Sequence, residues 1–531
     1  MEAVAKTDTP SASQGQPEAP PQHGGVESQS PQGVLSRIGL LLAVAALAVS
    51  SLLCGQWRFI APDEGFYLYA GRMALEGLVP YRDFFFPQAP LSPYLFAAWF
   101  AVAGRSWVLA RVLGSLVTLL ACLVLARTAR SVYGGRAALW ALLTFSLCAG
   151  VQLWLPTAKN VGFSALFLAL SLDAFLRRRC AKRAAFWLGF GVLARTTVAP
   201  AGLFLLLPLN PGRGAYLRQL KDVLLGAALP GMLAIAFVCA DPFNFWEGNF
   251  GYHLERTTFS DRYLARRRWE ILRGLFGSGP DAGLGGFQFA VLSGGALLSV
   301  LLNARSGWRP LALPATALVL TAVNFLPEPP HLQYFSVVTF LLVPPAAAAL
   351  DRVVSASKSQ RAPRTTGLIS AAVAFSCLAA FGYLGAGDAR RFLVTGDNVI
   401  GVGKYSRDSW RIEKMSEVSR AIDAANPEEK PVVSGWAGYL VESKSRALRG
   451  TENHFAFSWA QVRRFSPQEQ EKRHILSQAG AVEAFLKGDA SLAVAYAGPR
   501  RSRPLLDAVK AAGAKRVAKV GWVEIVGPGG K

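Results

Sequence analysis

The sequence predicts a polytopic α-helical membrane protein with about 11 transmembrane helices and a small C-terminal soluble α/β domain. Of the 531 residues, 52% are hydrophobic and only 17% are charged, which is too apolar for an ordinary soluble protein. Apolar runs long enough to cross a bilayer recur along the chain, with basic clusters between them. From about residue 388 the composition changes to that of a soluble domain.

The formal net charge of +22 does not by itself indicate a nucleic-acid partner. The basic residues lie in clusters between apolar runs, where membrane topology accounts for many of them. We therefore expect the lipid bilayer, and no nucleic acid, among the partners. The six cysteines lie in or beside apolar runs without CxxC spacing, so neither a disulfide framework nor a thiolate metal site is predicted.

Residues 1–33 predict a disordered cytoplasmic tail. They are rich in Pro, Gln, Ser, Gly and Ala and carry almost no large apolar side chain, so they cannot bury enough surface to offset the entropy of ordering. The segment 34–57 is interpreted as an uncleaved signal-anchor helix, because no signal peptide opens the chain. It is expected to leave residues 57–104 outside as the first external loop.

Basic residues orient the remaining spans. Arg127, Arg130 and Arg136 follow the second span, and a dense basic cluster at residues 177–183 follows the fourth. The positive-inside rule places both groups in the cytoplasm. The transmembrane domain covers residues 34–387, with a second external loop at 241–286. The predicted spans are residues 34–57, 107–125, 137–155, 161–176, 184–195, 197–209, 223–240, 287–302, 311–325, 335–350 and 367–386.

Residues 388–531 predict an α/β domain outside the membrane. PVVSGW and SLAVAYAG are typical of buried strands, RPLLDAVKAAG of a helix with a glycine stop, and KRVAKVGWVEIVG of one or two closing strands. An odd number of spans puts this domain on the side opposite the N-terminus, which is the side of both external loops.

The first external loop carries three carboxylates, Asp63, Glu64 and Asp83, among aromatic residues, prolines and glycines. If Asp63 begins a short helix, Tyr67 lies on its face at i+4, whereas Glu64 points elsewhere. That spacing predicts Asp63 and Tyr67 as one functional pair. Three structural alternatives stay open: Asp63 as a simple helix N-cap, Glu64 as a supporting residue, and Asp83 as a turn residue.

The loop resembles that of a known family. DEGFYLYAGRM, followed by LVPYRDF and the proline-flanked APLSPYLF, looks like the first external loop of the polyprenol-phosphate-dependent membrane glycosyltransferases of the GT-C superfamily. That superfamily includes protein O-mannosyltransferases and the aminoarabinose transferase of lipid A. The likeness is specific in the first loop. Over the rest of residues 34–386 it consists of span order, the large second loop and the EPPHLQYF turn.

The resemblance implies an inverting transfer of a sugar from a polyprenyl-phosphate donor to a lipid, glycan or protein acceptor, on the periplasmic side of a bacterial inner membrane. It assigns the base to the acidic residue that opens the loop, which matches Asp63 with Glu64 as its neighbour. Asp83 resembles the second acidic site of related loops. Such a transfer needs a carboxylate to take the acceptor proton and cations or hydrogen-bond donors to hold the departing phosphate.

Candidates for binding the donor phosphate and lipid lie at outer turns and in the first loop. Lys159 and Arg195 oppose the positive-inside trend, so each needs an anionic partner, although interfacial snorkelling would also explain them. The second loop interleaves aromatic and basic residues, which is typical of an amphipathic element on the membrane. The predicted set is Tyr67, Gln88, Lys159, Arg195, His253, Arg256, His331 and Tyr334.

One position departs from the family pattern. Many bacterial members carry Lys-Pro or His-Pro where this chain reads Pro87-Gln88-Ala89-Pro90. Either Gln88 binds by hydrogen bonds what a cation binds elsewhere, or the donor or acceptor differs.

Two further questions stay open in the sequence. A divalent cation could be shared by Asp63, Glu64 and Asp83, although the chain has no HExxH motif and no paired-histidine spacing. The alternative functions are a transporter or flippase for lipid-linked saccharides and a non-catalytic membrane scaffold. A flippase is expected to place ionisable residues at mid-membrane depth, and the predicted spans contain almost none.

Overall fold

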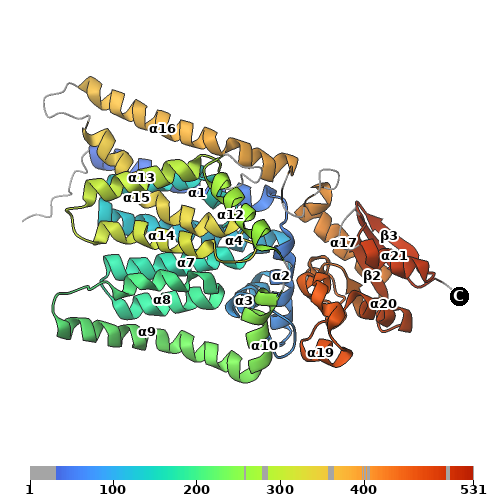
Figure 1. Ribbon diagram of the computed structural model, residues 1–531. Coiled ribbons are helices and arrows are strands. Elements are labelled where there is room, and N and C mark those ends of the chain that lie inside the picture. The colour runs from blue at the N-terminus through green and yellow to red at the C-terminus, as the bar shows by residue number, and fades with distance from the viewer. Residues whose placement is uncertain are drawn as a thin grey trace, which may run out of the picture.

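The computed structural model describes residues 31–255, 259–277, 285–356, 364–397, 399, 402, 407–497 and 503–529. These residues form a bundle of helices with a smaller region of helices and strands at one end (Figure 1). Most of the predicted N-terminal tail, residues 1–30, lies outside the described residues, and so does the predicted phosphate ligand Arg256.

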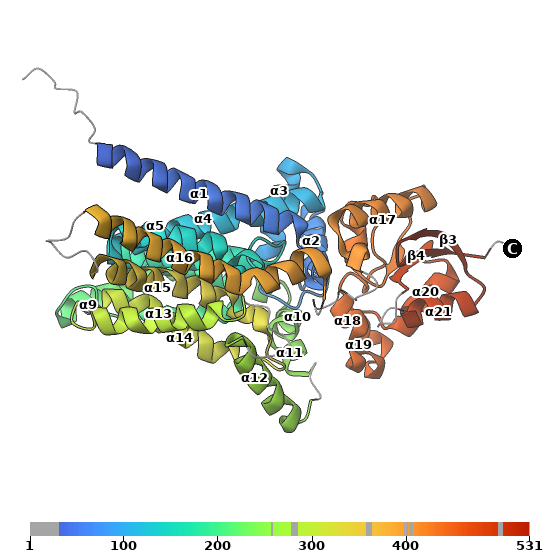
Figure 2. The same ribbon diagram turned by 90° about the horizontal axis from the view of Figure 1, so that it is seen from above.

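The bundle consists of helices that run side by side (Figures 1 and 2). Its α-helices are α1 (Pro31–Trp57), α4 (Trp107–Tyr133), α5 (Gly135–Leu147), α7 (Asn160–Leu172), α8 (Ala181–Ala194), α9 (Arg213–Ala240), α13 (Gln288–Asn303), α14 (Ala312–Asn324), α15 (Ser336–Ala356) and α16 (Arg364–Arg390). Its π-helical turns are η1 (Asp173–Arg177) and η6 (Arg391–Thr395), and its 3-10 segments are η2 (Thr196–Leu206) and η4 (Arg309–Leu311).

Shorter helices connect the bundle elements. They are α2 (Pro62–Leu75) and α3 (Leu91–Ala103) in the first predicted loop, α6 (Ala149–Gln152), then α10 (Pro242–Trp246), η3 (Glu247–Gly251), α11 (Tyr252–Glu255) and α12 (Asp261–Leu275) in the second, and η5 (Leu332–Phe335) before α15. In Figure 1, α2, α3 and α10 lie at the end of the bundle that meets the C-terminal region. The two predicted loops therefore meet at this end.

Each predicted span overlaps a helix or a 3-10 segment of the bundle, but these elements differ in length, and the span predicted at 137–155 is divided between α5 and α6. Within the described part of the chain, six are long and apolar enough to cross a membrane: residues 37–57, 107–133, 160–177, 213–240, 332–355 and 372–395. The span predicted at 197–209 is the 3-10 segment η2, which contains Pro200, and α3, α5 and α13 are short apolar helices. The membrane-helix class is confirmed, and the count of 11 stays a prediction.

The turn between α6 and α7 is inserted into the bundle end. A Cβ on Gly114 of α4 would lie 2.7 Å from the Thr157 carbonyl oxygen, and one on Gly162 of α7 would lie 2.8 Å from that of Leu155. Only glycine permits such close backbone approach. These contacts fix the position of the segment that ends in Lys159.

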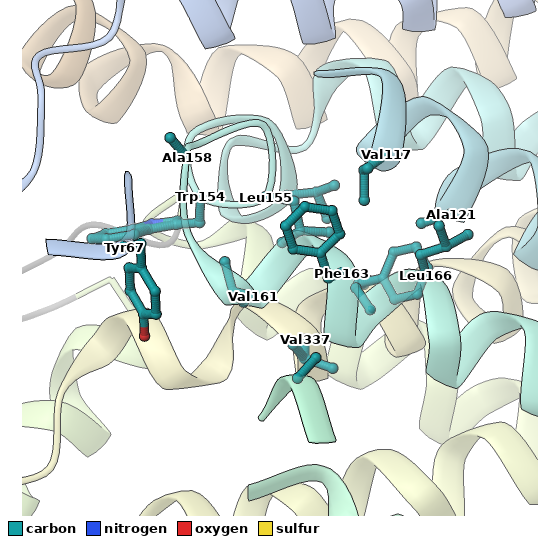
Figure 3. Packing of buried hydrophobic residues seen from close by; sticks show 14 of the residues in the cluster. Tyr67, Val117, Ala121, Trp154, Leu155, Ala158, Val161, Phe163, Leu166 and Val337 are labelled. Atoms are coloured by element: carbon teal, nitrogen blue, oxygen red, sulfur yellow. The ribbon is translucent and has the colours of Figure 1, made fainter. Parts of the chain in front are cut away.

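The core of the bundle is a continuous set of buried apolar side chains. Figure 3 shows part of it, where Val117 and Ala121 of α4 lie near Phe163 and Leu166 of α7. Dispersion and close packing hold such a core together. Tyr67 lies at the edge of this view, beside Trp154, at the boundary of the core.

The C-terminal region contains a four-stranded sheet in the order β1-β2-β4-β3. The strands are β1 (Val432–Ser434), β2 (Leu492–Tyr496), β3 (Lys515–Val520) and β4 (Val523–Gly527). The helices are η7 (Arg407–Trp410), α17 (Ile412–Ala425), η8 (Ala437–Leu440), α18 (His454–Ser458), η9 (Ala460–Arg464), α19 (Pro467–Lys472), α20 (Gln478–Lys487) and α21 (Arg503–Ala511).

Strands β1 and β2 are parallel, with Val433 opposite Ala493, and the other neighbours are antiparallel. All four strands lie in the segments from which strands were predicted. Strand β4 is buried throughout its length, which is typical of a strand covered on both faces. A separate domain that starts at residue 388 stays a prediction, because α16 ends only at Arg390.

Candidate active site

A cavity of about 2090 Å³ lies between the bundle end and the C-terminal region. Its walls come from the start of α2, the α6–α7 turn, the start of η2, the second loop and η5, and on the other side from the C-terminal region. Every described residue in the predicted donor-binding set lines this cavity: Tyr67, Gln88, Lys159, Arg195, His253, His331 and Tyr334. Asp63 lines it as well.

Helix α2 presents Asp63 to the cavity from its first turn. Its N-cap is Ala61, whose backbone N–H donates to the Glu64 carboxylate at 2.8 Å, and Pro62 follows at the first helical position. Proline suits that position because its missing N–H would have no helical partner. The N-cap interpretation of Asp63 is therefore wrong: Glu64 caps the helix, which leaves the Asp63 side chain for the cavity.

Asp63 forms an ion pair with Lys159. The Lys159 ammonium lies 3.0 Å from Asp63 Oδ2, and it also donates to Gln333 Oε1 at 3.2 Å. Burial alone would raise the pKa of Asp63, but the Lys159 charge and hydrogen bond hold that pKa below its usual value. Asp63 is therefore an ionised carboxylate at neutral pH, and 28% of its side chain stays exposed to the cavity.

A second polar group surrounds Arg195, which follows α8. Its guanidinium donates to Thr197 Oγ1 at 2.9 Å and to Asn160 Oδ1 at 3.2 Å, and it lies 5.3 Å from the centre of the Tyr334 ring. The Asn160 amide donates in turn to Gln88 Oε1 at 3.3 Å. Because Asn160 directly follows Lys159, one short segment connects both cationic groups.

Two histidines border the same cavity. His253 Nε2 lies 3.0 Å from the Pro87 carbonyl oxygen, which joins the second loop to the first. The His331 ring lies 5.4 Å from that of Tyr334, nearly perpendicular to it. These residues extend the polar wall from Lys159 and Arg195 toward η5 and the second loop.

Glu64 lies behind the cavity wall, fully buried. Its carboxylate accepts from Arg111 at 2.5 and 2.8 Å and from the Ala158 N–H at 3.0 Å, and Arg58 lies at 3.6 Å. Burial would raise the pKa of Glu64, but these guanidinium groups keep it low. Glu64 thus connects α2 to α4 and to the turn before Lys159, and it has no place among the cavity-lining residues.

Asp83 also lies apart from the cavity lining. Its carboxylate accepts from the Val79 N–H at 2.7 Å and pairs with the exposed Arg82 at 2.8 Å, so it closes the turn of the first loop. The structure therefore does not bring Asp63, Glu64 and Asp83 together. Within the described ranges, no three His, Cys, Asp or Glu side chains are grouped so that they could hold a metal ion.

Several residues in the cavity wall or directly behind it carried no strong signal in the sequence. Asn160, Thr197 and Gln333 are uncharged, and only their spatial neighbours show their importance. Arg58 follows α1 and looks like an interfacial residue, but it is 1% exposed and its guanidinium lies over the Trp154 and Phe392 rings. Burial lowers the pKa of Arg58 to about 10, a value at which it stays charged.

The C-terminal region completes the cavity. Its lining side chains include Trp436, Tyr439, His454, Phe455, Trp459 and Tyr496. The His454 ring lies 6.2 Å from that of Phe66, which is one helical turn after Asp63. His454 therefore lies on the wall of the cavity that the C-terminal region forms.

The bundle, the two loops at its end and the region that covers them form a fold that is similar to that of several solved structures. Solved structures with this fold include ArnT from Cupriavidus metallidurans in the apo state, with a TM-score of 0.60, 16% identity and coverage of 94% of this chain and 100% of that one. ArnT bound to undecaprenyl phosphate gives a TM-score of 0.58 with 15% identity and the same coverage.

An archaeal oligosaccharyltransferase, AglB from Archaeoglobus fulgidus in complex with an inhibitory peptide and a dolichol-phosphate, gives a TM-score of 0.54. It is 12% identical over 93% of this chain and 74% of that one. Comparison with protein-family models and with curated proteins gives no match. The fold that the GT-C resemblance of the first loop implied is thus confirmed.

Proposed function

We propose that the protein transfers a sugar from a polyprenyl-phosphate donor to an acceptor hydroxyl. The observation that carries this proposal is the state of Asp63. Lys159 donates to Oδ2, the described residues give Oδ1 no hydrogen bond, and Asp63 lines a large cavity. An ionised carboxylate with one free oxygen is suited to accept a proton.

The cations around the cavity support the leaving-group half of the reaction. Arg195 and Lys159 line the wall next to Asp63 together with His331, and preorganised cations and hydrogen-bond donors stabilise the charge that develops on a departing phosphate. Structural neighbours also support a lipid phosphate as the donor, because ArnT was solved with undecaprenyl phosphate and AglB with a dolichol-phosphate. Exposed apolar residues of the second loop, Trp246, Phe250 and Leu254, line the same cavity and suit a prenyl chain.

The proposed step is a single displacement at the anomeric carbon. The acceptor oxygen forms its bond to that carbon while the bond to the phosphate oxygen breaks, and the configuration inverts. The acceptor proton passes to Asp63 Oδ1, and the electron pair of the broken bond leaves with the polyprenyl phosphate. Tyr67 and Gln88 border the reacting groups, and both offer hydrogen bonds to sugar or phosphate oxygens.

We assign supporting roles to the other two acids. Glu64 holds α2 and the α6–α7 turn together through Arg111 and Ala158, so it acts on the reaction through the position of Asp63. Asp83 shapes the first loop through its bond to Val79. In this proposal, the basic side chains of the protein balance the negative charge of the donor phosphate, and no residue is assigned as a metal ligand.

The proposed topology follows the charge pattern. The N-terminus is cytoplasmic, and the cavity and residues 388–531 lie on the periplasmic side of a bacterial inner membrane. The basic cluster at residues 177–183 follows α7 at the end of the bundle away from the cavity (Figure 1). This arrangement obeys the positive-inside rule.

The test uses purified full-length protein in detergent with radiolabelled polyprenyl-phosphate sugars. The wild type is expected to release free polyprenyl phosphate and to label one of three acceptor pools: glycan, lipid or peptide. Asp63→Asn keeps the shape of the side chain and removes the base, so the rate should fall at least about 100-fold. Asp489→Asn, on an exposed turn, is the matched control.

Two results contradict the proposal. If Asp63→Asn releases polyprenyl phosphate as fast as the wild type, Asp63 is not the base. If the wild type releases none with any donor, the protein is not such a transferase. A flippase would move the donor across proteoliposomes with the sugar–phosphate bond intact, which the same labelled donors detect.

A further inference from the structure

The indole of Trp436 connects the C-terminal region to the backbone beside Asp63. Trp436 Nε1 donates a hydrogen bond of 2.7 Å to the carbonyl oxygen of Pro62, the residue before Asp63. The pyrrolidine ring of Pro62 already restricts its backbone φ angle. A further hydrogen bond on its carbonyl therefore fixes the peptide plane that leads into Asp63.

Packing holds the same indole against the next turn of α2. A Cβ on Gly65 would lie 2.4 Å from Trp436 Cε2 and Cζ2, so the ring occupies the space that any other residue at position 65 would need. On its other sides the ring stacks on Trp107 at 5.8 Å and meets Trp410 and Tyr439 edge to face. With 5% of Trp436 exposed, the indole has little freedom to move.

The backbone of Trp436 is rigid as well. It directly follows β1 and Gly435, whose N–H donates to the Val494 carbonyl of β2 at 2.8 Å. Ser434 Oγ donates to the carbonyl of Trp436 at 2.8 Å. The indole is therefore carried by the sheet and not by a free loop, and rigid support is what a positioned group requires.

The docking of the C-terminal region is extensive around this contact. Glu442 accepts the N–H of Trp107 at 2.7 Å, at the start of α4. At the same interface, the hydroxyl oxygen of Tyr69 in α2 accepts the Ala447 N–H at 2.7 Å. Residues on both sides of Asp63 along α2 thus contact the C-terminal region.

We infer that Trp436 is a positioning residue for Asp63, so that the C-terminal region sets the geometry of the base. This inference rests on the proposed function. It predicts that small changes at the Trp436–Pro62–Gly65 contact reduce turnover without reducing donor binding, because they shift the base and leave the cation wall of the bundle intact. A displacement of about 1 Å can cost two orders of magnitude in rate.

The main variant is Trp436→Phe, which keeps an aromatic ring and removes the N–H donor. We expect kcat to fall about 10-fold or more with the donor KM within about twofold of wild type. Trp522→Phe, at an exposed tryptophan of the same region, should leave both values unchanged. The acid limb of the pH–rate profile should move to higher pH in Trp436→Phe, because a looser Asp63–Lys159 pair raises the pKa of the base.

A second variant approaches the contact from α2. Gly65→Ala places a methyl group into the indole and should also reduce kcat, whereas Gly294→Ala in α13, with no atom near its added Cβ, should not. Phe lacks the part of the indole that meets position 65. The double variant Trp436→Phe/Gly65→Ala should therefore lose less activity than the product of the two single losses.

A measurement without substrate keeps the two proposals separate. Hydrogen–deuterium exchange of the peptide that covers residues 61–68 should be faster in Trp436→Phe than in wild type and Trp522→Phe. Wild-type exchange together with wild-type kcat in Trp436→Phe overturns the positioning role, even if Asp63→Asn is inactive. If Asp63→Asn stays active while exchange is faster in Trp436→Phe, the base assignment fails and the structural contact stands.

Discussion

Lys159 Nζ lies 3.0 Å from Asp63 Oδ2, although the two residues are 96 positions apart in the chain. The ammonium is only 7% exposed and the carboxylate 28%, so the charge of Lys159 is shielded from water and acts mainly on its partner. Opposite charges at this distance stabilise the ionised form of both groups. The pair therefore sets the pH at which Asp63 becomes a base.

Lys159→Met should move the acid limb of the activity profile upward. Lys159 holds the pKa of Asp63 down against the burial that would raise it. Without the ammonium, burial dominates and Asp63 protonates at higher pH. Activity requires the ionised carboxylate, so the limb in kcat/KM should rise by about one to two pH units. Lys182→Met, in the basic cluster far from the cavity, is the control, and an unmoved limb would contradict the assignment.

The Asp63–Lys159 pair also stabilises the folded state, and this contribution changes with pH in a definite direction. Because the folded-state pKa of Asp63 is depressed, its contribution is present above the unfolded pKa and is lost as the pH falls through the folded value. Thermal unfolding of wild type and Asp63→Asn should therefore converge as the solution is made acid below pH of about 4. A constant difference across the acid range would argue against a depressed pKa.

Glu64→Gln should unfold the site rather than merely slow the reaction. The substitution leaves the buried guanidinium groups of Arg111 and Arg58 without their counter-ion. Removal of one partner from a buried ion pair typically costs about 3–5 kcal/mol. Thermal unfolding in detergent measures the loss. Glu483→Gln removes an exposed pair with Lys487 on α20 and should change the midpoint little, and an equal midpoint for Glu64→Gln would show that the network is not structural.

Arg195→Gln should weaken donor binding. Arg195 is held by Thr197 and Asn160 beside the Tyr334 ring, so its charge is preorganised for an anion. We expect the donor KM to rise about 10-fold, in line with the loss of one charge-assisted contact of roughly 1.5 kcal/mol. Arg195→Lys should recover part of this loss, because it restores charge but not the planar fork. Arg213→Gln at the exposed start of α9 is the control. If Arg195→Gln leaves the donor KM unchanged, Arg195 does not bind the donor phosphate.

Local periodicity explains which parts of the site the sequence could predict. The i, i+4 spacing of Asp63 and Tyr67 on one helix required only the pitch of α2, and both side chains line the cavity. Lys159 and Arg195 stood out as cations on the outer side of a membrane protein. In each case a rule that depends on nearby residues or on the bilayer was sufficient.

The partners of those residues could not be predicted in the same way. The ion pair of Glu64 with Arg111 joins residues 47 positions apart, and the Trp436–Pro62 hydrogen bond joins residues 374 positions apart. No periodic pattern connects such positions, and a Trp after a short strand looks like any core residue. Asn160, Thr197 and Gln333 lack charge, so only the packed structure shows that they hold the cations.

Arg72→Met should loosen the C-terminal region from the bundle. The Arg72 guanidinium is 2% exposed and donates to the backbone carbonyls of Leu440, Ser443, Lys444 and Ser445 at 2.6–3.1 Å. Methionine fills similar volume but leaves these buried acceptors without a donor, which should cost about 3 kcal/mol or more. Limited proteolysis should then cleave after residue 390 faster than in wild type, and thermal unfolding should begin earlier.

The control for Arg72→Met is Arg420→Met, which removes an exposed arginine from α17 within the same region. Because the docked region carries Trp436, Arg72→Met should also reduce kcat by more than it raises the donor KM. Arg72 lies outside the cavity lining, so we expect this effect on turnover to pass through the docking of the C-terminal region and the position of α2. Wild-type protease resistance with reduced kcat would indicate a different route, and full activity with a loosened region would show that docking does not set the geometry of Asp63.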